Sequence, residues 1–156
     1  MVSQVLSADS HVLEPPDLWT TRMQGKFRDR APHLIHEYNG QTGDFLVCEG
    51  LRPFNPTSLG SAGIPPEEHE QFSRGGYAVC RPGSWDPAER LKDMDIDGVD
   101  AEVLYVGGPL QTADAALHLD SVRGYNRWLS DYASHAPDRL LGVAAIPIDT
   151  PERAVE

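Results

Sequence analysis

An aspartate and a histidine stand two positions apart near the N-terminus, in the triplet Asp9-Ser10-His11. The short apolar run of residues 4–9 is typical of a β-strand, so the triplet would lie at the carboxyl end of that strand. Residues i and i+2 of a strand point to the same face. We therefore expect Asp9 and His11 to converge as ligands of a divalent metal, Zn²⁺ or Mn²⁺. The alternative, an aspartate that caps a turn and a histidine packed in a core, stays open.

Glu14 follows shortly after the triplet and precedes Pro15 and Pro16, which bar continuation of the strand. Its carboxylate could support the metal site or bind substrate, or the residue could simply fix the turn before the prolines. We name Glu14 as a candidate substrate-binding residue and identify no catalytic residue.

Other residue types with chemical potential give weaker signals. Cys48 and Cys80 belong to no CxxC motif, so we expect two reduced thiols, although Arg81 could lower the pKa of Cys80. We expect the remaining histidines to be ordinary surface or packing residues: His33, His36, His69, His118 and His135. An arginine of the long central segment could clamp a substrate carboxylate, with a solvated side chain as the simpler interpretation: Arg52, Arg74 or Arg81.

Length and composition limit the class of protein. A chain of 156 residues has room for one domain and not for two. A net charge of −11 argues against nucleic-acid binding, which relies on Lys and Arg. The sequence contains neither a long apolar run nor a signal peptide, so we expect a cytoplasmic protein without membrane contact. Its expected partners are a small-molecule substrate and, as a further possibility, a second copy of the chain.

A long insertion is predicted to separate the first strand from the rest of the fold, at about residues 20–85. Residues 33–48 contain two β-favouring runs on either side of a Gly-containing connection, Asn39-Gly40-Gln41-Thr42-Gly43, which is typical of a β-hairpin. Residues 49–85 are rich in Gly and Pro and show no sustained period. We expect a long loop there, of the kind that often forms a lid or binding loop.

Regular elements return at Asp86-Pro87-Ala88-Glu89, which has the pattern of a capping box and predicts a helix start. A strand is predicted at residues 99–106, a helix at 118–135, and a strand buried on both faces at 140–146. Another helix is expected to begin at Thr150. This alternation indicates an α/β fold with a parallel sheet, and both doubly wound sheets and β/α barrels begin in this way.

Three segments resemble the amidohydrolase-related family that includes aminocarboxymuconate semialdehyde decarboxylase: residues 7–19, residues 90–105, and residues 125–129 with 137–143. The resemblance implies the N-terminal part of one (β/α)₈ TIM-type barrel over residues 1–156, with the hairpin and long loop inserted after strand 1. It also implies a metal held by the first strand and by a His and an Asp of later strands. The implied reaction is hydrolysis or non-oxidative decarboxylation of a small carboxylic or cyclic substrate.

Two features depart from that family pattern. Many relatives carry His-x-His in the first strand, where this sequence has Asp9-x-His11. The predicted strands also cover only part of a barrel, which takes about 250 residues. We therefore expect this chain alone to be inactive, and the alternative interpretation is a truncated, non-catalytic paralogue or a fragment that depends on a partner.

Overall fold

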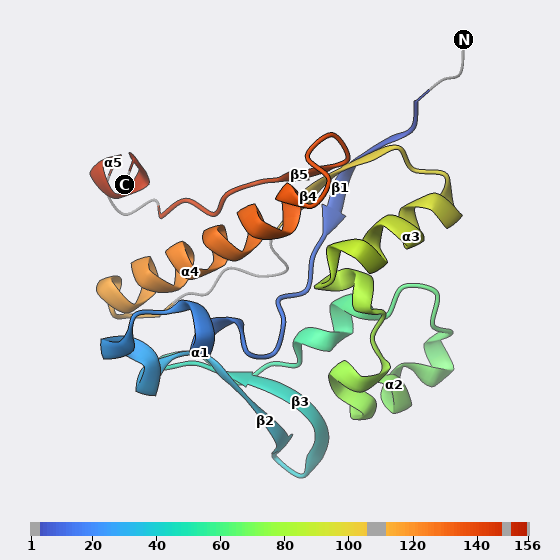
Figure 1. Cartoon of the computed structure of the whole chain (residues 1–156). Helices are drawn as coiled ribbons and strands as arrows, with labels where there is room; N and C mark the ends of the chain where they lie inside the picture. The colour runs from blue at the N-terminus through green and yellow to red at the C-terminus, as the bar shows by residue number, and fades with distance from the viewer. Residues whose placement is uncertain (1–3, 106–111, 148–150, 156) are drawn as a thin grey trace.

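Three parallel strands form the central sheet of the computed structural model, which describes residues 4–105, 112–147 and 151–155. The order of the strands is β1 (Leu6–His11), β4 (Ala101–Tyr105) and β5 (Leu140–Gly142). Strands β2 (His33–Tyr38) and β3 (Gln41–Val47) form an antiparallel hairpin outside this sheet (Figure 1). The predicted parallel sheet and the separate hairpin are both confirmed.

Helices α3 (Pro87–Asp97) and α4 (Ala115–Ser134) connect the parallel strands. Asp86 caps α3 as predicted, since its carboxylate accepts from the Ala88 and Glu89 amides. Helix α4 begins three residues before its predicted start because Asp114 caps it in the same way. Both helices therefore begin directly after an aspartate that acts as the N-cap.

One hydrophobic core joins both helices to the same face of the sheet. Helix α4 has a buried apolar stripe. Its residues other than Val122 pack in one cluster with Met94 of α3, Leu104 of β4 and Leu140 of β5. The stripe consists of Val122, Tyr125, Leu129 and Tyr132. Because α3 and α4 share this cluster, they cover one face of the sheet, and no helix of the described residues covers the other face.

The segment after β1 is folded, so the prediction of a structureless loop at residues 49–85 was wrong. Helix α1 (Leu18–Arg22) and the 3₁₀ helix η1 (Gly25–Arg30) precede the hairpin. Short helices then follow one another: η2 (Pro56–Gly60), η3 (Pro66–Glu68), α2 (His69–Gly75), η4 (Gly76–Val79) and η5 (Pro82–Ser84). Prolines open three of these turns, where a missing amide hydrogen is tolerated, and such short turns have no periodicity to detect.

Strand β5 is shorter than predicted and is not buried on both faces. Leu140 is buried, whereas Leu141 is 48% and Val143 39% exposed. After Gly142 the chain leaves the strand, and the Asn126 side chain bonds both the amide and the carbonyl of Ala145, each at 2.9 Å. The end of the other predicted strand, Val106, and the predicted cap Thr150 lie outside the described residues, while α5 (Pro151–Val155) begins where a helix was expected.

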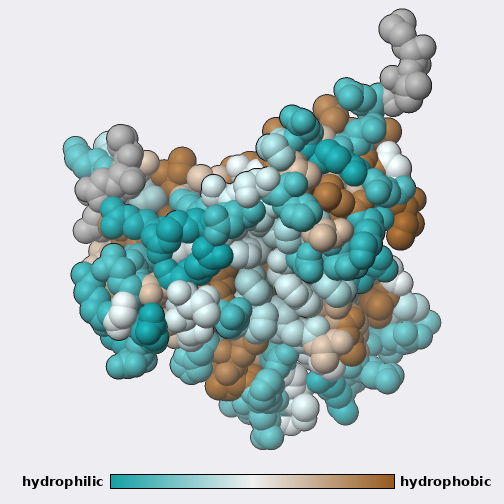
Figure 2. Space-filling model, viewed as in Figure 1, coloured by the Kyte–Doolittle hydropathy of each residue, from teal (hydrophilic) through white to brown (hydrophobic). Residues whose placement is uncertain are grey.

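The uncovered face of the sheet carries exposed apolar side chains. Neighbours in register share a face, so Ser10 lies with the buried Leu104, and His11 lies on the opposite face with the exposed Tyr105. Figure 2 shows hydrophobic groups interrupting the polar surface over the start of β1 and the end of α3. Within the described residues, no helix is long and apolar enough to cross a membrane.

Candidate metal-binding site

Asp9 and His11 lie together at the carboxyl end of β1. Between Ser7 and Ser10 the strand advances by three residues while β4 advances by two, which is a bulge with one extra residue. Beyond the bulge, the Asp9 Oδ1 and His11 Nε2 atoms lie 3.6 Å apart. The structure thus brings the two predicted ligands to one point, on the face that lacks helices.

The separation of these two atoms suits a shared metal ion. Ligand distances of about 2.0–2.1 Å and tetrahedral angles place a zinc-bound oxygen and nitrogen about 3.3–3.4 Å apart. The two side chains are also open to solvent, with Asp9 87% and His11 50% exposed. One carboxylate and one imidazole therefore fit two positions of a Zn²⁺ or Mn²⁺ site.

The site is incomplete within the part of the chain that the structure describes, where no group of three His, Cys, Asp or Glu residues could hold a metal. Three other histidines bond elsewhere: His33 to the Ala31 carbonyl, His36 to Asp44 at 2.6 Å and His69 to the Ile64 carbonyl. Catalytic and structural zinc sites use three or four protein ligands. Two ligands would hold a metal only weakly.

Arg90 fixes the end of β1 from helix α3, a role that the sequence did not predict. Its Nη1 donates to the His11 carbonyl at 3.3 Å, and its Nε donates to Glu102 Oε2 of β4 at 2.7 Å. The Arg90 and Glu102 side chains are only 16% and 10% exposed. This ion pair joins α3, β4 and β1 directly behind His11.

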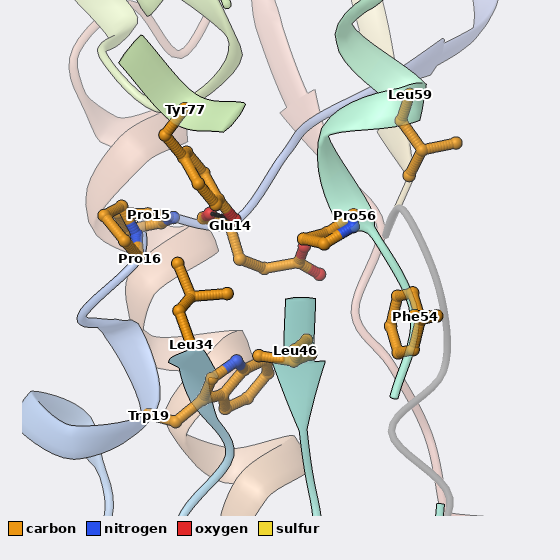
Figure 3. A pocket seen from close by; sticks show the side chains of 10 residues that line it. All are labelled: Glu14, Pro15, Pro16, Trp19, Leu34, Leu46, Phe54, Pro56, Leu59 and Tyr77. Carbon is orange, nitrogen blue, oxygen red and sulfur yellow. Dashed lines mark hydrogen bonds between the residues drawn. The ribbon is translucent and has the colours of Figure 1, made fainter. Parts of the chain in front are cut away.

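Glu14 lines a small pocket formed between the segment that follows β1, the hairpin and η2 (Figure 3). Figure 3 shows its side chain reaching across the pocket toward Pro56, with Leu34 and Trp19 on one side and Tyr77 on the other. The Tyr77 hydroxyl donates to the Glu14 backbone carbonyl at 2.8 Å. Burial among these apolar groups raises the pKa of Glu14 to about 7, against a smaller opposing effect of a backbone hydrogen bond.

Burial and ion pairing set the environments of the cysteines and arginines in the inserted segment. Cys48 and Cys80 are free thiols, as expected. Burial, and secondly the charge of Asp44, raises the pKa of Cys80 to about 11, so Arg81 does not lower it. The Arg81 guanidinium instead pairs with Asp93. Arg81 and Arg90 do line, with His11, a hollow of about 530 Å³. Both guanidinium groups there are already neutralised by carboxylates.

Comparison with known proteins gives a likeness of fold. The chain is similar to the crystal structure of an amidohydrolase from Mycobacterium avium subsp. paratuberculosis K-10, with a TM-score of 0.69 and 20% sequence identity. The match covers 99% of this chain and 46% of that protein, so this chain spans less than half of the length of that amidohydrolase. No family model matches the sequence. The likeness agrees with the broader resemblance to amidohydrolases, and it does not distinguish a decarboxylase-like branch.

Proposed function

We propose that this chain is the N-terminal part of a metal-dependent enzyme of the amidohydrolase superfamily, built on a (β/α)₈ barrel. Its reaction would be hydrolysis or non-oxidative decarboxylation of a small carboxylic or cyclic substrate, as the decarboxylase-like family resemblance implies. The observation that carries the proposal is the 3.6 Å approach of Asp9 and His11 at the carboxyl end of a parallel strand. Catalytic groups of β/α barrels lie at that end of the strands.

The uncovered sheet face supports the barrel part of this proposal. In a β/α barrel the helices cover the outside and the opposite face of each strand points into the interior. Here α3 and α4 cover one face, and His11, Tyr105 and Leu141 lie on or beside the other. Apolar side chains on that face are what a barrel interior requires, and the remaining strands would bury them.

Each candidate residue has a distinct role in this proposal. Asp9 and His11 would hold the metal, which when bound polarises a substrate oxygen or lowers the pKa of a bound water. Arg90 positions His11 through its backbone carbonyl. Glu14, three residues beyond His11, would contact the substrate from its apolar pocket.

A second candidate function follows from the exposed apolar side chains of the sheet and of the segment after β5. Leu6, Leu141 and Ile146 are all about half or more exposed, at 67%, 48% and 59%. Exposed apolar groups beside a free strand edge favour association with another polypeptide. A non-catalytic chain that folds stably only with a partner would show this surface, and it would have no need of Asp9.

Calorimetric titration with Zn²⁺ or Mn²⁺ tests the metal site. We expect weak binding to the chain, which is abolished in Asp9→Ala and in His11→Ala and is retained in a His69→Ala control, because His69 bonds to Ile64 in the insertion. Binding that is equal in all four proteins would contradict the assignment of the ligands. Tight stoichiometric binding lost in both site variants would show that the site is already complete.

A further inference from the structure

The pocket around Glu14 has a closed end and an open end. Trp19 and Leu46 are only 3% and 8% exposed, whereas Phe54 and Leu59 are 43% and 51% exposed. Figure 3 shows the Glu14 carboxylate extending from the segment after β1 toward the side on which Phe54 and Leu59 lie. The enclosed space is about 20 Å³, which accommodates about one water-sized group. A ligand that enters past Phe54 and Leu59 can therefore place one small group against the carboxylate.

Two side chains with oxygen atoms line this pocket, and both act as hydrogen-bond acceptors toward a ligand. The Tyr77 hydroxyl uses its hydrogen to bond the Glu14 backbone carbonyl at 2.8 Å, so its oxygen is left to accept. An ionised Glu14 carboxylate accepts and does not donate. The pocket therefore favours a ligand group that donates hydrogen bonds, and it disfavours carboxylates and phosphates.

The charge of Glu14 has no counter-charge inside the pocket. Among the described residues that line it, none is a Lys, Arg or His. Tyr77 of η4 lines the pocket, while α1, the hairpin and η2 contribute uncharged side chains: Trp19, Leu34, Leu46, Phe54, Pro56 and Leu59. The charge of Glu14 helps to raise the pKa of Tyr77 and of Tyr125 on α4, so both phenols keep their protons at neutral pH. A positive ligand group would supply the missing counter-charge.

We propose that the Glu14 pocket binds a primary ammonium group, with the apolar body of the ligand against Phe54 and Leu59. An ammonium group at the end of an alkyl chain is compact, donates three hydrogen bonds and accepts none. It therefore matches the enclosed space, the two acceptors and the charge of the pocket. The inference that the substrate is an amine rests on the proposed function, whereas the pocket itself requires no metal at Asp9 and His11.

NMR titration of the chain with n-butylammonium at pH 8, in the presence of EDTA, tests the site. We expect the methyl signals of Leu34 and Leu46 to shift. The uncharged n-butanol should bind about tenfold more weakly, and tetramethylammonium, which has no hydrogen to donate, should leave these signals unchanged. Glu14→Gln should weaken binding of n-butylammonium about ten- to a hundredfold, the loss of a hydrogen bond to a charged group. The exposed Glu67→Gln serves as the control and should bind normally.

The pH dependence separates recognition of charge from apolar binding. Burial raises the pKa of Glu14 to about 7, so the affinity for n-butylammonium should fall about tenfold for each pH unit below 7, and that for n-butanol should not. These two series use the wild type and do not depend on the folding of a variant.

Four results would overturn the proposal: no methyl shift with n-butylammonium, equal affinity for n-butanol or tetramethylammonium, an affinity unchanged in Glu14→Gln, or one unchanged between pH 8 and pH 5. The methyl spectrum of Glu14→Gln shows whether that variant is folded. Because EDTA is present, the titration succeeds or fails independently of the metal titration at Asp9 and His11. Failure of the metal assignment is therefore distinguishable from failure here.

Discussion

Replacing Glu14 by Gln should make the protein more stable at alkaline pH. Burial raises the folded-state pKa of Glu14 from an ordinary 4.5 to about 7. A carboxyl with a raised folded-state pKa favours the folded state when it is protonated. Its contribution is fully present below pH 4.5, and it is lost as the pH rises through 7. Glutamine does not ionise and avoids that loss.

The size of the effect follows from the shift in pKa. Each pKa unit corresponds to about 1.4 kcal/mol, so the raised pKa of Glu14 amounts to a ceiling of about 3 kcal/mol. The side chain is partly exposed, and solvent reduces this figure. We expect the free energies of unfolding of wild type and Glu14→Gln to agree within about 1 kcal/mol at pH 5. At pH 9 the variant should be more stable by about 2–3 kcal/mol.

Urea unfolding at intervals between pH 5 and pH 9 measures this difference directly. The exposed Glu67 of η3 provides a matched control, since Glu67→Gln removes the same charge outside the pocket. The variants differ from the wild type at one residue each, so the comparison isolates the effect of that residue. Parallel stability curves for wild type and Glu14→Gln over the whole range would refute the assignment of a raised pKa to this pocket.

Three further outcomes are expected. The chain alone should show no hydrolase or decarboxylase activity with added Zn²⁺ or Mn²⁺, because its two candidate ligands, Asp9 and His11, are too few; turnover abolished in His11→Ala would contradict this. Arg90→Met should lower the free energy of unfolding in urea by about 3–5 kcal/mol, because it leaves the Glu102 carboxylate buried and unpaired. A decrease below about 1 kcal/mol would show that water reaches the Glu102 carboxylate in the variant. Asp114→Ala should cost about 1 kcal/mol and increase amide exchange in the first turn of α4; unchanged exchange would speak against its role as the cap.

The sequence predicted those elements whose signals are local. Asp86 marks the start of α3 because a cap carboxylate acts within a few residues, and in the structure the left-handed Gly98 ends the helix. Only half of the capping box formed, however. The Glu89 side chain accepts from Lys92, and the Asp86 amide donates to the Pro82 carbonyl. The Asp86 amide bonds to Pro82 because η5 folds against the start of α3.

The candidate site was predictable in part for the same reason. The period of a strand places Asp9 and His11 on one side, and the structure has them 3.6 Å apart. Arg90 was missed because its partners, His11 and Glu102, are 79 and 12 residues away. The burial of Glu14 depends on side chains of the hairpin and of η2, which only the folded insertion supplies. Long-range packing of this kind leaves no periodic trace in the sequence.

The error in predicting β5 and the proposal of a barrel have the same physical basis, which is the exposure of apolar side chains at and after β5. A continuous apolar run predicted a strand buried on both faces at residues 140–146, yet Leu141 and Val143 are exposed. Leu141 pairs with Val103 and so lies on the side of the sheet that carries His11 and Tyr105. An apolar run of this kind is costly to leave in water, so its sequence is suited to a second covering layer. If further strands supplied that layer, they would bury Leu141 and bring additional ligands toward His11 in the same step.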